Sequence, residues 1–173
     1  PSVPYGTTGI GSPGHLAMAG LAAKAGIPLQ HVPYKGETPM VQDLLGNHLE
    51  LGLMTLSVAG PLFKSGQIKP IALASTRRAA THPDVPTFAE AGFPESSVQT
   101  WAGILAPKGL PAAVVDRLNT AVATVLQRPQ LQADLLAAGF TPAHAGPDAF
   151  SQLIRDELAR YRQMISVAGV TAE

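Results

Sequence analysis

The sequence predicts an α/β fold in which short strands and helices alternate around a largely parallel sheet. Short apolar runs typical of buried strands alternate with stretches of helical composition over residues 3–74. Glycine and proline occur 17 and 16 times among 173 residues, so each element should be short and clearly bounded. Apolar residues make up 46% and charged residues 14% of the chain, a balance that excludes intrinsic disorder.

The elements of the first 74 residues are expected to alternate in type. Apolar, β-branched or aromatic runs predict strands at residues 3–5, 29–34, 49–54 and 68–74, the last weakened by Pro70. Helical composition predicts helices at residues 15–25, 40–45 and 57–64, with Gly26 and Gly66 ending the first and third. Thr38 is placed to be the N-cap of the second helix, with Pro39 at its first position.

The last third of the chain changes character. A loop-rich segment with one helical turn near residues 88–91 precedes a predicted strand at 98–105, around Trp101. Apolar residues at helical spacing then predict three amphipathic helices at residues 111–126, 129–138 and 147–168. These helices either form a small bundle or cover a second sheet whose strands lie upstream. The start at Pro1 favours the second explanation.

Charge and composition exclude several classes of function. Twelve Lys and Arg residues balance twelve Asp and Glu residues, so we expect no nucleic-acid partner. No stretch approaches the ~20 apolar residues that span a bilayer. There are no cysteines, the five histidines lack metal-ligand spacing, and no nucleophile–base pair is apparent. The residues therefore give no sign of a catalytic centre, and we expect no cofactor or metal.

A glycine- and hydroxyl-rich loop at residues 6–14 is the first candidate site. Its glycines allow close approach of a ligand to the backbone, and Thr7, Thr8, Gly11 and Ser12 would supply hydroxyl and amide donors at the N-terminus of the next helix. This combination is typical of anion binding. The alternative is an ordinary strand-to-helix turn capped by Ser12. The loop also matches G-x-G-x-x-G, weakly, because Pro13 lies inside the motif and the second strand ends in Tyr34-Lys35, where an acid for the ribose is expected.

Two further strand ends are candidates for the same crevice, since ligands of open α/β sheets lie at the carboxyl ends of strands. Lys35 would supply a positive charge and Gly36 an amide, although Lys35 could equally be solvated beside a turn glycine. Met54 and Thr55 follow the third strand, where core packing of Met54 is the common alternative. We expect the first two loops to be adjacent if their strands are neighbours.

Several strings resemble the substrate-binding proteins of tripartite tricarboxylate transporters, the Bug family. The likeness covers nearly the whole chain, and its most specific strings are Val-Pro-Tyr-Lys-Gly, at residues 32–36, and Asp-Val-Pro-Thr-Phe-Ala-Glu-Ala-Gly, at residues 84–92. Others are Tyr-Gly-Thr-Thr-Gly-Ile-Gly-Ser, at residues 5–12, and Trp-Ala-Gly-Ile-Leu-Ala-Pro, at residues 101–107.

The resemblance implies a periplasmic-binding-protein-like α/β fold (type II) of two domains around a cleft. Residues 1–100 would be domain 2, and residues 101–173 the mostly helical returning segment of domain 1; the N-terminal part, with a signal peptide, would be missing. Members bind small carboxylates in the periplasm, deliver them to a membrane permease and perform no chemistry.

The resemblance also implies roles for single residues. Thr7, Thr8, Gly11 and Ser12 would lie in the carboxylate loop, and Lys35 and Gly36 in a second contact loop. Many members carry an acid where this chain has Met54, so a ligand with an α-amine is disfavoured.

Two other interpretations remain open at this level. One is an enzyme that binds a phosphorylated or dinucleotide substrate at the glycine loop, and the other is a structural domain in which the loop is only a turn. Incompletely covered helices of the last third would also favour self-association of the chain.

Overall fold

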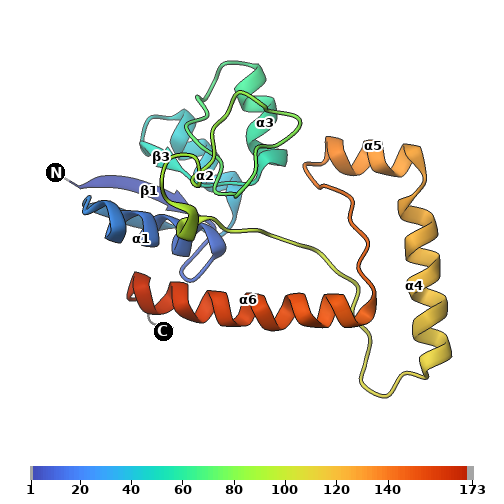
Figure 1. The fold of residues 1–173 in the computed structure, drawn as a ribbon. Coiled ribbons are helices and arrows are strands. Elements are labelled where there is room, and N and C mark those ends of the chain that lie inside the picture. The colour runs from blue at the N-terminus through green and yellow to red at the C-terminus, as the bar shows by residue number, and fades with distance from the viewer. Residues whose placement is uncertain (1, 171–173) are drawn as a thin grey trace. The chain divides into compact units, whose positions relative to one another are not determined.

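The computed structural model describes residues 2–170 (Figure 1). Three strands and six α-helices are joined by turns and by one 3₁₀ helix, η1. In chain order the elements are β1 Val3–Thr7, α1 Pro13–Ala25, β2 Leu29–Pro33, α2 Glu37–Leu45, β3 Leu51–Gly52, α3 Leu56–Lys64, η1 Pro94–Ser96, α4 Ala112–Leu126, α5 Pro129–Ala137 and α6 Pro147–Ala168. None of the helices in this part of the chain is long and apolar enough to cross a membrane.

Internal contacts divide the described residues into two compact units. Unit 1 contains the chain up to Thr100 together with the residues from Arg160 onward, and unit 2 contains Trp101–Ala159. Helix α6 begins in unit 2 and ends in unit 1. The assignment of these parts to the two domains of a complete binding protein stays a prediction.

The sheet of unit 1 is parallel, with strand order β2-β1-β3. Tyr5 at the centre of β1 pairs with His31 on β2 and with Leu51 on β3. Parallel neighbours require a crossover, and α1 and α2 supply the connections. The expected parallel sheet is therefore confirmed, with β1 in the middle, so all three strands end at the same edge.

Helices cover both faces of this sheet. Leu16 and Ala17 of α1 are buried, and His15 of the same helix stacks on His31, which contacts Tyr5 and Thr7 of β1. On the other face α2 places Met40 directly over Gly6, where a Cβ atom would come within 2.9 Å of the Met40 sulfur. A glycine is thus required at Gly6 because the helix packs against the bare backbone there.

Two local predictions for unit 1 are wrong. Residues 68–74 form no strand; Leu73 makes only an isolated bridge with Thr87, because its amide and carbonyl bond to the 86–88 segment instead of to a neighbouring strand. Helix α2 begins at Glu37 after Gly36, so Gly36 rather than Thr38 is its N-cap. The φ of +106° at Gly36 is a conformation that only glycine adopts readily, which explains the earlier helix start.

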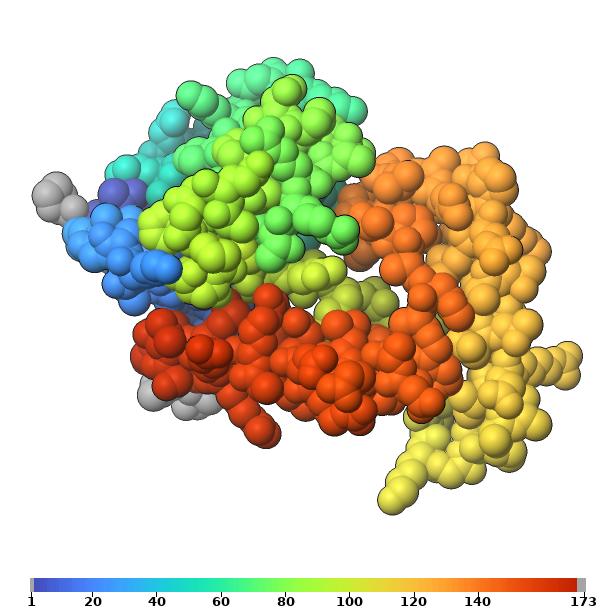
Figure 2. Space-filling view, viewed as in Figure 1, coloured from blue at the N-terminus to red at the C-terminus, as the bar shows by residue number. Residues whose placement is uncertain are grey.

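The 84–92 string forms a structural element of its own. The Glu90 carboxylate accepts the Thr87 amide at 2.8 Å, and the Thr87 hydroxyl accepts the Glu90 amide at 3.1 Å, which is a capping box around one turn. Arg78 donates to the same carboxylate at 2.9 Å, and these hydrogen bonds lower the pKa of Glu90. Figure 2 shows this part of the chain, in yellow-green, packed against α1 in blue.

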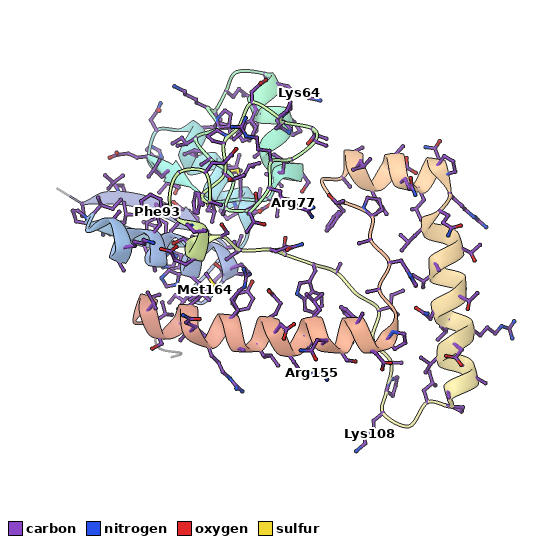
Figure 3. All side chains as sticks on the ribbon, viewed as in Figure 1. Lys64, Arg77, Phe93, Lys108, Arg155 and Met164 are labelled. Atoms are coloured by element: carbon purple, nitrogen blue, oxygen red, sulfur yellow. The ribbon has the colours of Figure 1, made fainter. Side chains whose placement is uncertain are left out.

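The C-terminal end of α6 completes unit 1. Met164 is buried, and Figure 3 shows it pointing from α6 toward the rest of that unit, where Phe93 precedes η1. Arg160 donates a hydrogen bond to the Ser97 carbonyl at 3.2 Å. Lys24 of α1 forms an ion pair with Glu95 of η1 nearby.

Unit 2 consists of α4, α5, the first part of α6 and the extended segment before them. The expected helices are present, and α4 meets α5 at a corner (Figure 1). The predicted strand at residues 98–105 is wrong: no described strand pairs with this segment, and Ile104 and Leu105 are 75% and 71% exposed. The Trp101 ring packs edge-on against Phe150 at 5.2 Å. No residue of this unit is buried.

Candidate ligand-binding site at the strand ends

The carboxyl ends of β1, β2 and β3 bring three turns together in unit 1. We call them the glycine turn (residues 8–12), the lysine turn (residues 34–36) and the third turn (residues 53–55). The Tyr34 amide donates to the Thr7 carbonyl at 2.9 Å, and the Leu53 amide donates to the Gly6 carbonyl at 3.0 Å. The expected adjacency of the first two turns is confirmed, and the third turn flanks the glycine turn on its other side.

Thr7 anchors the base of the glycine turn. Its side chain is completely buried, and four polar atoms surround the hydroxyl oxygen: His31 Nε2 at 2.7 Å, Gly9 O at 3.2 Å, and Gly9 N and Ser12 Oγ at 3.3 Å each. A hydroxyl has one proton and two lone pairs, so these partners use all of its capacity. In this structure Thr7 therefore fixes the turn and is inaccessible to a ligand.

The amides of the glycine turn fall into two groups. Gly9 N donates to the Thr7 hydroxyl, Gly11 N donates to His15 Nδ1 at 3.0 Å, and Ser12 N donates to Gly9 O at 3.3 Å. Among the described residues, no acceptor bonds to the amides of Thr8 or Ile10.

The side chains of the turn also differ in availability. Thr8 is exposed, whereas the Ser12 hydroxyl caps α1 by accepting the His15 amide at 3.2 Å. The capping role considered for Ser12 is thus present, and the donors that remain available belong to Thr8 and Ile10.

Two stacked histidines lie beneath the glycine turn. The rings of His15, in the first turn of α1, and His31, on β2, are 3.7 Å apart at their centroids and nearly parallel, at 10°. Tyr5 contacts His31 from the neighbouring strand, with ring centroids 5.2 Å apart. Burial, and then the neighbouring His15, lower the pKa of His31 to about 4, and burial lowers the pKa of His15. Both rings are therefore neutral at pH 7.

The lysine turn provides the cation and a second helix N-terminus. Lys35 is exposed, and Gly36 has open space around its Cα. No side chain caps α2, so the amides at its N-terminus are unpaired in the described chain. The Tyr34 hydroxyl points away to Asp43, to which it donates at 2.7 Å. This turn can therefore bind an anion through Lys35 and backbone amides together.

A carboxylate of the protein itself occupies the third turn. Glu37 Oε1 accepts the Thr55 amide at 2.6 Å, and Oε2 accepts the Thr55 hydroxyl at 2.9 Å. The Thr55 hydroxyl is also 2.9 Å from Ser57 Oγ. Met54 is half-buried, and its methyl group packs beside Gly52. Thr55 is thus engaged by Glu37, while Met54 makes a packing contact.

The structure therefore separates the expected site residues into two groups. Thr8, Lys35 and Gly36 carry available groups at one edge. The other expected residues form hydrogen bonds within the protein or are packed: Thr7, Gly11, Ser12, Thr55 and Met54. Sequence reasoning missed His31 and Glu37. Strand alternation could have placed His31 on the Tyr5 face, but its pairing with His15 depends on the sheet order.

Unit 1 also has a groove away from the strand ends. A groove of about 430 Å³ lies between α1, η1 and the end of α6, lined largely by apolar side chains such as Leu16 and Met164. In the described part of the chain, no group of three or more His, Asp or Glu side chains is placed to hold a metal ion. The strand-end edge is therefore the site best suited to a small anion.

Comparison with known proteins identifies the family. The model of the tripartite tricarboxylate transporter family receptor matches residues 1–170. The chain belongs to this receptor family. Its members are solute-binding receptors, in agreement with the resemblance found in the sequence.

Relatives of this receptor family differ in length. A UPF0065 protein from the tcbD-tcbE intergenic region of Pseudomonas sp. (strain P51) is 33% identical over 93% of this chain and 48% of its own length. Protein BugT of Bordetella pertussis is 30% identical over 96% and 51%. A UPF0065 protein from the clcB-clcD intergenic region of Pseudomonas knackmussii is 34% identical over 91% and 94%. The chain thus spans about half the length of the first two and nearly all of the third.

Solved structures of receptors show the same fold. R. palustris Rpa4515 with adipate has a TM-score of 0.84 at 30% identity, over 98% of this chain and 56% of that one. The periplasmic binding protein BugD has a TM-score of 0.78 at 29% identity, over 99% and 58%. MatC from Rhodopseudomonas palustris with bound malate has a TM-score of 0.75 at 27% identity, over 94% and 56%. The predicted periplasmic-binding-protein-like α/β fold is confirmed.

Proposed function

We propose that this chain supplies one wall of a receptor site that captures a small organic carboxylate for a tripartite tricarboxylate transporter. The observation that carries the proposal is the hydrogen bond from the Tyr34 amide to the Thr7 carbonyl, which keeps the glycine and lysine turns side by side. The available amides, the exposed Thr8 hydroxyl and Lys35 then belong to two neighbouring turns at the carboxyl ends of the strands. Relatives that contain adipate and malate support the chemical class of the ligand.

Binding would rest on backbone dipoles more than on the single cation. The amides of Thr8, Ile10 and Gly36 can each donate to a carboxylate oxygen, with Lys35 beside them. A hydrogen bond to a charged acceptor contributes about 1.5–3 kcal/mol. Two or three such bonds, less the cost of association, correspond to affinity of about millimolar for one wall of a cleft. Weak binding by this chain alone is therefore expected.

The surroundings favour a plain organic acid over an amino acid. Met54 has no charge with which to meet an ammonium group, and both oxygens of Glu37 already accept hydrogen bonds from Thr55. We infer that a ligand without an α-amine is preferred.

The whole receptor would act in the periplasm and present its ligand to the membrane permease. Closure of a cleft around the ligand is the general means by which binding proteins signal their loaded state. A receptor needs no catalytic group for this task. Binding of the permease is testable by co-purification with and without the ligand.

A ligand panel distinguishes this proposal from its rivals. The chain is titrated at pH 7.5 with adipate, malate, ATP and NAD, and amide shifts are followed by NMR together with the melting temperature. We expect adipate or malate to shift the amides of Thr8, Ile10 and Gly36. Shifts caused only by ATP or NAD would favour the nucleotide-binding enzyme, and no shift with any compound would favour a structural domain.

Lys35→Gln tests the cation directly. We expect this substitution to weaken adipate or malate binding roughly threefold to tenfold, because an exposed charge contributes little more than about 1 kcal/mol. Lys64→Gln, at the exposed C-terminal end of α3, is the matched control and should leave the affinity unchanged (Figure 3). Equal affinity of the Lys35→Gln variant and the wild-type chain would contradict a role for Lys35.

A further inference from the structure

Two histidine side chains, His15 and His31, hold the glycine turn through hydrogen bonds and would not contact the ligand. Gly11 N donates to His15 Nδ1 at 3.0 Å, and His31 Nε2 lies 2.7 Å from the Thr7 hydroxyl. Gly9 donates to that same hydroxyl, so the two imidazoles reach the turn through Gly11 on one side and Thr7 on the other. One ring of the stacked pair is thus bonded to Gly11 within the turn, and the other to Thr7, the residue that precedes it.

These contacts constrain the protonation of the rings. An imidazole nitrogen that accepts an amide proton carries no proton itself, so His15 must be the neutral tautomer with its proton on Nε2. Stacking at 3.7 Å also opposes a charge on both rings at once. Tyr5, the other titratable group against His31, has a pKa raised by burial to about 12 and stays neutral.

We propose that His15 and His31 are positioning residues, which hold the glycine turn in its binding conformation as a neutral stacked pair. Their bonds to Gly11 and Thr7 orient the backbone so that the intervening amides of Thr8 and Ile10 face outward. The ligand-binding half of this inference rests on the proposed carboxylate site. The effect on the turn itself can be measured without any ligand.

The experiment uses variants that remove or retain one hydrogen-bonding group. His15→Leu removes the partner of Gly11, whereas His15→Asn places an amide oxygen near the position of Nδ1. His31→Leu removes the partner of the Thr7 hydroxyl, whereas His31→Gln places a side-chain amide near the position of Nε2. His48→Leu is the control, because the His48 side chain is 77% exposed after the end of α2. Amide exchange, ¹⁵N imidazole shifts and adipate affinity are measured on the full 173-residue chain at pH 7.5.

We expect His15→Leu to speed exchange at Gly11 and to weaken adipate binding roughly fivefold to tenfold, the factor expected for one lost hydrogen bond. In His15→Asn, the exchange rate at Gly11 and the adipate affinity should return most of the way to the wild-type values. The imidazole of wild-type His15 should carry its proton on Nε2. His31→Leu should speed exchange at Gly9, with recovery in His31→Gln. Variants that bind and exchange like the wild type, or a wild-type His15 with its proton on Nδ1, would overturn the proposal.

The two proposals fail in different ways. If adipate and malate leave the wild-type amides unshifted, the carboxylate site fails, and faster Gly11 exchange in His15→Leu with recovery in His15→Asn still supports the positioning of the turn. If the wild type binds adipate and the leucine variants bind it equally well, the carboxylate site stands and the positioning role is excluded. Equal loss in the leucine, asparagine and glutamine variants would indicate a packing role and also overturn the inference.

Discussion

At the scale of single residues, hydrogen bonding separates available donors from engaged ones. Thr7 and Thr8 are adjacent hydroxyls, yet Thr7 is completely buried among four polar atoms and Thr8 is exposed. Successive side chains of a strand point to opposite faces, and β1 ends at Thr7, so the two positions meet different surroundings. The same composition that indicates an anion site therefore includes groups that build the turn.

Acidification is expected to destabilise unit 1 through the stacked histidines. The folded protein lowers the pKa of His31 from its usual 6.5 to about 4, so between these values the unfolded chain binds a proton that the folded chain does not. The stabilisation is thus complete above about pH 6.5 and is lost as the pH falls toward 4. We expect the melting temperature to fall by a few degrees across this range.

The control for this pH dependence is a second histidine variant. His31→Gln should flatten the melting profile between pH 6.5 and pH 4, whereas His48→Gln should retain the wild-type slope. Hydrogen bonds from Arg78 and Lys24 are the main cause of the lowered pKa values of Glu90 and Glu95, so the stabilisation from these two groups is lost only at the acidic end of this window and below it. A profile for His31→Gln as steep as that of the wild type would contradict the assignment.

At the scale of elements, the close approach of α2 to the sheet defines the site edge. Met40 is buried over Gly6, and α2 begins immediately after the lysine turn. The distance between helix and strand therefore influences where the amides of Gly36 and its neighbours lie. Packing on this face and ligand geometry are linked through a single short helix.

Gly6→Ala tests this packing. A Cβ atom at Gly6 would lie 2.7 Å from Leu49 Cδ2 and 2.8 Å from Met40 Cγ, so both side chains must move. We expect a loss of about 1–3 kcal/mol in the free energy of unfolding, typical of an overpacked core. Chemical denaturation followed by circular dichroism measures it.

Gly20→Ala is the matched substitution on α1, where the nearest atom, Ser96 Oγ, would be 3.4 Å away. Alanine is the better helix former, so this variant should be as stable as the wild type or more stable. If Gly6→Ala proved equally harmless, the close contact between α2 and β1 would be refuted.

At the scale of the whole molecule, the two units differ in burial. Unit 1 contains all the buried residues of the described chain, whereas unit 2 has none. Leu118 of α4 and Leu136 of α5 are 49% and 41% exposed, although their helices have amphipathic sequences. The apolar faces of these helices therefore lack a cover within unit 2, and self-association of the chain stays a prediction.

Hydrogen exchange should reveal this difference. Helices gain most of their stability from packing, so we expect amides of α4 and α5 to exchange on the order of 100-fold faster than those of α1 in dilute solution. Sedimentation velocity over a range of concentrations shows whether copies associate and whether protection rises with association. Equal protection of α4 and α1 in a chain that sediments as a monomer would contradict this expectation.

Much of the architecture could be predicted from local patterns. The helices predicted at residues 129–138 and 147–168 are present as Pro129–Ala137 and Pro147–Ala168, and the strand–helix alternation predicts the parallel sheet. The predicted strands at 68–74 and 98–105 failed for one reason. A strand needs a partner edge for its amides and carbonyls, and no local composition records whether such an edge is present.

Local patterns along the chain predict most of the elements in their order, the family and the two turns whose residues suit an anion. Which donors remain available depends on the folded arrangement, since Thr7 and Gly11 are engaged by His31 and His15 from other elements. Helix and turn signals depend on neighbours within a few residues, and the chain shows them directly. Hydrogen-bond availability depends on partners as many as 24 residues away, and those partners are set by the strand order β2-β1-β3.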